Sequence, residues 1–108
     1  MRKYELMVIT VPEIGTEGRD ELKAKISAAI EKEKGKVEFF EMWKEKNKMF
    51  HIIRSRGADK RKYDEGTYFL CNFTVESTKL ASLKYVLDLD ERILRYMNIV
   101  KGDVDGLA

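Results

Sequence analysis

The order of strand-like and helix-like patterns along the 108 residues constrains the fold of this chain more than any other feature. Apolar residues that alternate with polar ones indicate a strand, whereas apolar residues three and four positions apart indicate one face of a helix. The patterns predict the order strand, helix, strand, strand, helix, strand. Residues 3–11 form the first strand, and residues 67–75 form the third, which alternates most cleanly.

Two helices are predicted between these strands. Their apolar stripes are Leu22, Ile26, Ala29 and Ile30 in the first helix and Leu80, Leu83 and Leu87 in the second. Thr16 and Ser77 are the expected N-caps, because a hydroxyl at this position can accept a hydrogen bond from the first helical turn. Gly35 is expected to end the first helix in the left-handed conformation.

The middle of the chain predicts a long hairpin. Residues 36–53 are apolar enough for a strand, but their alternation slips near Phe39 and again near Trp43, which a β-bulge would explain. Residues 54–65 are the polar turn of this hairpin, and residues 93–101 form the last strand.

This order of elements predicts an α+β fold, the ferredoxin-like βαββαβ sandwich, with a four-stranded antiparallel sheet and two helices on one face. Residues 1–101 are expected to form the single domain, and residues 102–108 a short flexible C-terminal tail. The other sheet face is left open. An open face is normally polar, so apolar residues that point outward there suggest contact with a partner. The candidates are Met7, Ile9, Tyr68 and Leu70.

Several functional classes are excluded by composition. Cys71 is the only cysteine and His51 the only histidine, so neither a disulfide nor a zinc site is expected. No paired catalytic groups and no phosphate-binding glycine loop are found, so the chain is predicted to be no enzyme and to hold no metal or cofactor. No apolar run approaches the roughly 20 residues that span a bilayer. A cytoplasmic protein is expected, without membrane or DNA as partner.

The charge distribution is more informative than the net charge of +2. Residues 44–62 hold eight basic and two acidic residues, a local balance of 8 − 2 = +6, whereas the rest of the chain has 13 − 17 = −4. Aromatic residues lie close by in the sequence: Trp43, Phe50, Tyr63 and Tyr68. A basic hairpin end with aromatic neighbours suits attraction of nucleic-acid phosphates, with some packing of the aromatic side chains on bases or sugars.

The third strand does not carry the aromatic octet of the RNA-recognition motif, which shares this order of elements. Residues 65–72 keep the glycine and one aromatic residue, but Glu65 replaces the basic residue and Thr67 stands at the first stacking position. Any RNA contact is therefore expected to depend mainly on backbone charge and shape.

Four segments carry a resemblance to a known family. They are MRKYEL at residues 1–6, GKV at 35–37, GTYF at 66–69 and LDLDERILRYM at 87–97. The chain resembles the bacterial small-subunit ribosomal protein six family over roughly residues 1–101. It looks like a divergent member, because the stretch after Trp43 lacks the family's usual tyrosine and proline.

The resemblance implies a structural, non-catalytic protein of the ribosome. Such a protein binds the central domain of small-subunit ribosomal RNA together with ribosomal protein eighteen. Residues that match the family's basic positions are Arg2, Lys3, Lys46, Lys48 and Arg95. With them, the hairpin cations are expected to contact RNA phosphates: Arg54, Arg56, Lys60, Arg61 and Lys62.

Two other functions remain open on the sequence alone. The same fold serves small enzymes or ligand sensors, such as acylphosphatase-like hydrolases, since fold does not fix function. Such an enzyme needs an arginine in the loop after the first strand, and here the first arginine in that region is Arg19. The other alternative is a homo-oligomeric module that pairs through the open sheet face.

Overall fold

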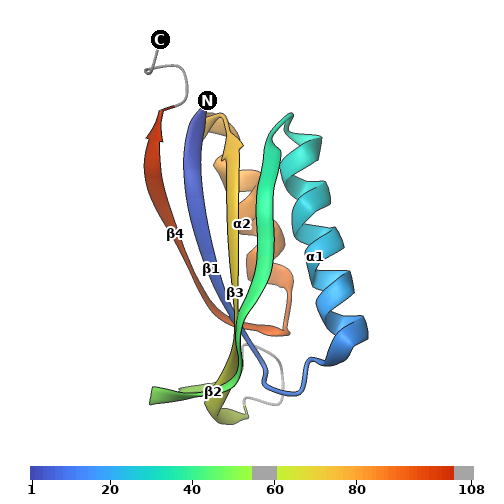
Figure 1. The fold of residues 1–108 in the computed structure, drawn as a ribbon, viewed down its shortest axis with the longest axis vertical. Helices are drawn as coiled ribbons and strands as arrows, with labels where there is room; N and C mark the ends of the chain where they lie inside the picture. The colour runs from blue at the N-terminus through green and yellow to red at the C-terminus, as the bar shows by residue number, and fades with distance from the viewer. Residues whose placement is uncertain (55–60, 104–108) are drawn as a thin grey trace.

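The computed structural model describes residues 1–54 and 61–103, and these form one sheet with helices on one side. The elements in chain order are β1 (Arg2–Thr10), α1 (Gly15–Lys32), β2 (Lys36–Arg54), β3 (Lys62–Val75), the 3₁₀ turn η1 (Ser77–Lys79), α2 (Leu80–Leu89) and β4 (Ile93–Asp103). This is the predicted order, and Figure 1 shows the strands lying beside the two helices.

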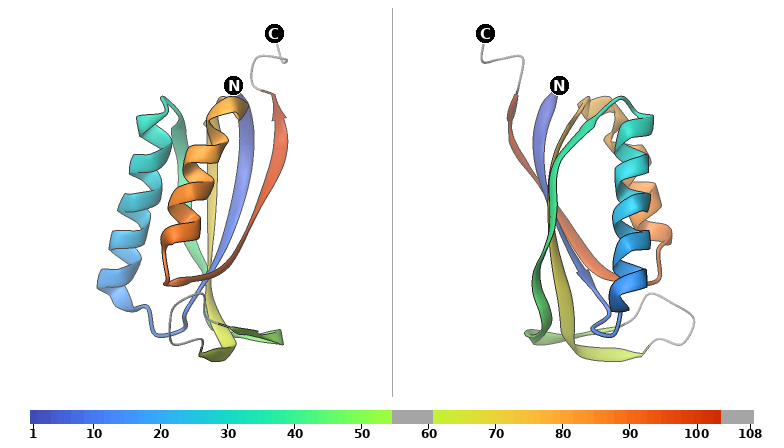
Figure 2. Two further views of the ribbon diagram at one scale, coloured as in Figure 1. Left: turned by 180° about the vertical axis from the view of Figure 1, so that it is seen from behind. Right: turned by 45° about the vertical axis from the view of Figure 1, so that its right-hand side comes forward.

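The sheet has the strand order β2-β3-β1-β4, with every neighbouring pair antiparallel. Both helices lie against the same face, as the two views of Figure 2 show, so the other face is open. The predicted ferredoxin-like α+β fold is therefore confirmed. Because β1 is central, its inward side chains Tyr4, Leu6 and Val8 are almost completely buried.

The core lies between the sheet and the helices. Tyr4 of β1 stacks on Phe73 of β3, with ring centroids 5.3 Å apart. Leu22, Ile26 and Ile30 of α1 and Leu83 and Leu87 of α2 are buried, as the predicted stripes require. Cys71 is buried among them, and burial raises the pKa of its thiol to about 12.

The helix ends differ from the prediction. Thr16 lies inside the first turn of α1, which no side chain caps, and Ser77 begins η1, three residues before α2. The left-handed residue is Lys34, with φ 63°, and not Gly35. Gly35 is needed for space instead, because a Cβ there would lie 2.5 Å from the carbonyl oxygen of Thr74.

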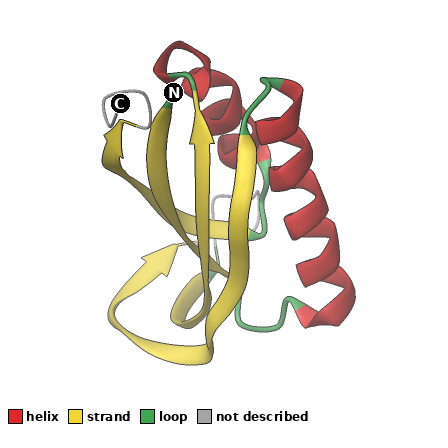
Figure 3. Ribbon diagram, turned by 45° about the horizontal axis from the view of Figure 1, so that its top comes forward, coloured by secondary structure: helices red, strands yellow, loops and turns green. Residues whose placement is uncertain are grey.

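β2 and β3 extend beyond the rest of the sheet. The pairing of β1 with β3 ends at Thr10 and Thr67, whereas β2 and β3 continue to pair as far as Arg54 and Lys62. We call residues 46–54 and 61–66 the hairpin end; Figure 3 shows it bending away from the other strands. Register shifts occur between Val37 and Phe39 and between Met42 and Lys44, where the sequence predicted bulges.

β4 continues through Gly102 to Asp103, two residues into the predicted tail. Residues 104–108 lie outside the described part of the chain.

Candidate RNA-binding and partner-binding surfaces

The hairpin end gathers five of the predicted RNA-binding residues. All five are exposed: Lys46, Lys48, Arg54, Arg61 and Lys62. Arg54 of β2 lies opposite Lys62 of β3, so exposed cations of both strands come together at the hairpin end. Arg56 and Lys60 belong to the same predicted set, but they lie outside the described residues.

Hydrogen bonds hold the base of the hairpin end against the loop between β1 and α1. The backbone N–H of Lys46 donates to Oγ1 of Thr67 at 3.3 Å, and this hydroxyl donates to the carbonyl oxygen of Pro12, also at 3.3 Å. Gly66 packs so closely on β1 that a Cβ would lie 2.6 Å from the Ile9 side chain. The direction of the hairpin end is therefore set by packing against β1.

Two ion pairs add to this attachment. Arg19 of α1 bonds to Glu45 of β2, and Arg61 lies 3.8 Å from the carboxylate of Glu13. These exposed pairs are individually weak. They link β2 to α1 and the segment before β3 to the loop that precedes α1.

The remaining predicted cations lie elsewhere. Arg2 and Lys3 are exposed at the start of β1, about 26 Å from Thr10 at a strand rise of about 3.3 Å per residue. Arg95 of β4 lies opposite Ile9, on the open face next to the hairpin end. The structure thus divides the predicted RNA contacts into two groups at opposite ends of the sheet.

The predicted partner-binding residues do lie together on the open face. Met7 pairs with Leu70, and Ile9 pairs with Tyr68, so the four side chains form two adjacent rows that are half-buried. Met97 of β4 extends the row of Met7 and is 52% exposed. The alternation of residues 93–101 could have indicated Met97, but its position beside Met7 depends on a register that the sequence does not reveal.

Trp43 and Tyr68 form an aromatic pair on the open face. The sequence places both near the basic hairpin and makes Tyr68 a candidate for partner contact, but it does not indicate that the two rings meet. Trp43 of β2 contacts Tyr68 of β3 edge-on, with ring centroids 6.2 Å apart and an interplanar angle of 83°. The ammonium of Lys44 lies 5.0 Å from the centroid of the Trp43 ring. Trp43 is 53% exposed, although large aromatic side chains are usually well buried.

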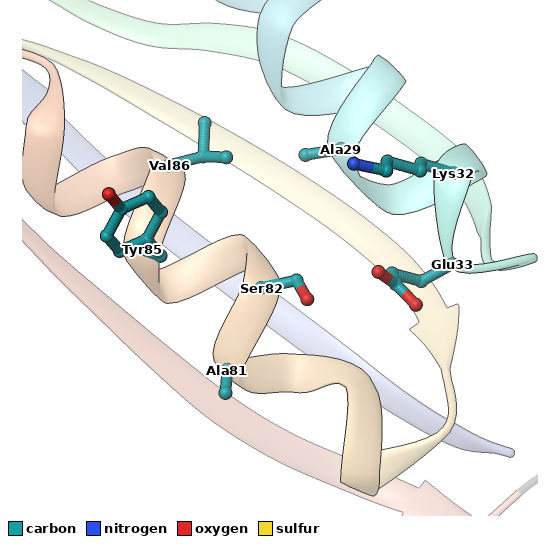
Figure 4. Close-up of a pocket in the computed structure, with 7 residues that line it drawn as sticks. All are labelled: Ala29, Lys32, Glu33, Ala81, Ser82, Tyr85 and Val86. Carbon is teal, nitrogen blue, oxygen red and sulfur yellow. The ribbon is translucent and has the colours of Figure 1, made fainter.

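The helix side of the molecule carries a groove of about 510 Å³ between α1 and α2. Its lining, drawn in Figure 4, is Ala29, Lys32, Glu33, Ala81, Ser82, Tyr85 and Val86. The lining of this groove contains no histidine that could serve as a base for Ser82 and no cysteine that could serve as a nucleophile. Within residues 1–54 and 61–103, no three metal-ligating side chains come together.

A charge cluster around the buried Asp90 has a structural role. Asp90 accepts hydrogen bonds from Nε and Nη2 of Arg92, at 3.0 and 2.8 Å, and from the backbone N–H of Arg92 at 2.9 Å. Burial acts to raise the pKa of Asp90, but the hydrogen bonds and charge of Arg92, with the charge of Lys25, outweigh it and lower that pKa. Arg92 also bonds to Glu21, so the cluster joins the start of β4 to α1.

None of the helices in the described part of the chain combines the length and the apolar character that crossing a membrane requires.

Comparison with known structures supports the fold. The 30S ribosomal protein S6 of Thermotoga maritima superposes with a TM-score of 0.71 at 23% identity, over 98% of this chain and 92% of that one. The C-terminal domain of the MgtC protein from Mycobacterium tuberculosis also superposes, with a TM-score of 0.59 at 13% identity, over 96% of this chain and 94% of that one. Since differently named proteins share this fold, the fold alone does not fix the function.

Sequence comparison is more specific. The small ribosomal subunit protein bS6 of Fusobacterium nucleatum subsp. nucleatum is 35% identical over 103 residues, which cover 95% of this chain and all of that protein. The bS6 protein of Symbiobacterium thermophilum is 33% identical over 97 residues, 90% of this chain and 94% of its own length. The family model described as ribosomal protein S6 matches residues 3–100. The resemblance seen in the four sequence segments is confirmed: the chain belongs to the ribosomal protein S6 family, whose members are structural ribosomal proteins and not enzymes.

Proposed function

We propose that the chain is a constituent of the small ribosomal subunit and binds its ribosomal RNA chiefly through the hairpin end. The single observation that carries this proposal is the set of exposed cations on two strands that project beyond the sheet. Phosphate contacts made by such cations supply most of the affinity of nonspecific RNA binding and much of the specific affinity. The small ribosomal subunit named in the bS6 relatives is the setting in which this RNA is found.

The open face suits a protein partner, which we assign to ribosomal protein S18, the ribosomal protein eighteen of the family resemblance. The row of Leu70, Met7 and Met97 is apolar and only partly covered. Glu41 lies opposite Leu70, and Glu5 lies beside Met7 on the adjacent row. Such carboxylates repel RNA phosphates and favour a basic protein. An apolar centre with a polar rim is the usual composition of a protein–protein interface.

An acylphosphatase-like enzyme is not supported. The loop between β1 and α1 has no arginine, and Arg19 in α1 is bonded to Glu45. Membership of the S6 family supports the structural role instead.

The RNA proposal is tested by the salt dependence of binding to a transcript of the central domain of small-subunit ribosomal RNA. The triple variant Lys46→Gln, Lys48→Gln, Lys62→Gln should weaken binding, and the slope of log K against log salt should fall by about 0.9 for each phosphate that is no longer neutralised. The matched control is Lys23→Gln, Lys32→Gln, Lys84→Gln, which removes the same charge from exposed helix positions. Equal slopes for the two triple variants would contradict a role for the hairpin end.

A further inference from the structure

We propose that Trp43 and Tyr68 form a stacking platform for one unpaired RNA base, where the hairpin end meets the open face. This inference rests on the proposed RNA-binding function and names a contact beyond its phosphate contacts. The pair differs from the aromatic positions of the RNA-recognition motif, which the third strand does not provide.

The bulge in β2 brings Trp43 to this position. Met42 lies opposite the buried Phe69, and Lys44 lies opposite Tyr68, so Trp43 is the extra residue between two ladder pairs. On β3, Phe69 and Cys71 point into the core. Since successive side chains of a strand point to opposite faces, Tyr68 and Leu70 point to the open face. Contact of the Trp43 ring with Tyr68 therefore places the indole on the open face.

The perpendicular geometry of the two rings suits contact with a third, flat ring. Because their planes are nearly perpendicular, a flat base can stack on the face of one ring while its edge contacts the other. By contrast, Tyr4 and Phe73 stack on each other in the core, and Phe40 packs on Phe69 there. Every nucleobase has a π face, so such a platform accepts a base with little regard to sequence.

Cations lie on both sides of the platform. Lys44 lies over Trp43 on β2, and Arg95 projects from β4 opposite Ile9. These two strands are separated by three inter-strand spacings, or about 14 Å. A stacked nucleotide with its neighbouring phosphates fits between them, and the strand can continue onto the cations of the hairpin end.

The same charges favour RNA over a protein at this place. The row that holds Tyr68 and Ile9 ends in Lys44 and Arg95, whereas the next row begins with Glu41. The open face is thus divided between an aromatic row with basic ends and an apolar row with acidic neighbours. Docking of a protein on Trp43 is the alternative outcome of the test.

Trp43 is the only tryptophan of the chain, so its fluorescence reports on the platform directly. Addition of single-stranded octaadenylate should quench it, while an abasic octamer and a duplex of the same length should leave it nearly unchanged. With labelled octaadenylate, Trp43→Ala should raise the Kd about tenfold, since stacking on an aromatic side chain contributes about 1–3 kcal/mol per base. Trp43→Phe should recover much of this loss, and the salt slope should stay constant.

The matched control is Tyr85→Ala, which removes an aromatic side chain of similar exposure (66%) from the helix side. It should leave the Kd unchanged. Equal binding of octaadenylate by Trp43→Ala and the unmodified protein would overturn the platform, and weaker binding of S18 by the same variant would assign Trp43 to the protein interface. The RNA-binding proposal fails separately, if the hairpin triple variant keeps its salt slope.

Discussion

The ion cluster around Asp90 shows how a single residue can connect two elements. A nearly buried carboxylate is costly unless charged hydrogen bonds compensate it, and here Arg92 supplies three of them. Arg92 also reaches Glu21 and the carbonyl oxygen of Gly18 on α1. The turn that leads into β4 is therefore fastened to the first helix.

Asp90→Asn should lower the free energy of unfolding by about 2 kcal/mol at neutral pH, since bonds to charged groups contribute about 1.5–3 kcal/mol each and Arg92 is partly exposed. Urea denaturation measures this, with the exposed neighbour Glu91→Gln as control. Because the folded state lowers the pKa of Asp90, its contribution is complete well above about pH 4 and declines as the pH falls through the lowered pKa. The difference between the variant and the unmodified protein should therefore shrink in acid. A difference independent of pH would contradict this role of the carboxylate.

At the scale of elements, the end of α1 needs a left-handed residue and a residue without a side chain, and these needs fall on two neighbouring positions. Lys34 takes the left-handed conformation, which costs a side-chain-bearing residue about 1–2 kcal/mol, whereas Gly35 provides the space that β3 needs. Lys34→Gly should therefore stabilise the protein by about 1 kcal/mol. Gly35→Ala should destabilise it by about 2 kcal/mol, as overpacking usually does. Thermal unfolding of both variants checks the pair, and Lys32→Gly, a glycine in the last helical turn, should be destabilising as control. Stabilisation by Gly35→Ala would show that β3 can move.

Element types and apolar stripes could be read from the sequence, because burial of one face leaves a periodic pattern. Leu22, Ile26 and Leu83 are buried as predicted. Helix ends were less predictable, since Thr16 and Ser77 are only locally suited to capping, and the close approach of Gly35 to β3 is a tertiary contact that the sequence does not reveal.

At the scale of the whole molecule, two functional surfaces occupy different regions. The hairpin end projects from one end of a body 46 Å long, and the apolar row lies across the middle of the open face. Binding of S18 should therefore be weakened tenfold or more by Leu70→Lys with Met97→Lys, because a charge would be placed in an apolar interface. The salt slope for RNA should not fall in this variant. Tyr85→Lys is the control, and loss of RNA binding in the Leu70–Met97 variant alone would show that the two surfaces overlap.

The two surfaces also differ in how well the sequence predicts them. A run of cations between Lys44 and Lys62 is visible in the sequence, so the hairpin end was found directly. Met97 and the contact of Trp43 with Tyr68 were missed because they depend on neighbours from other strands, through a register and a bulge that only the folded chain defines. Conversely, Arg2 is far from the hairpin end, although the family pattern groups it with the same RNA contacts.

The projection of β2 and β3 past Thr10 also has a dynamic consequence. There the ladder is only two strands wide, without β1 beside it, so its amide hydrogens are protected by few neighbours. Local opening of such a segment needs far less free energy than global unfolding. Its amides should exchange with solvent deuterium long before those of β1, and bound RNA should slow that exchange. The hairpin end can thus adjust to its RNA while the core beneath the helices stays folded.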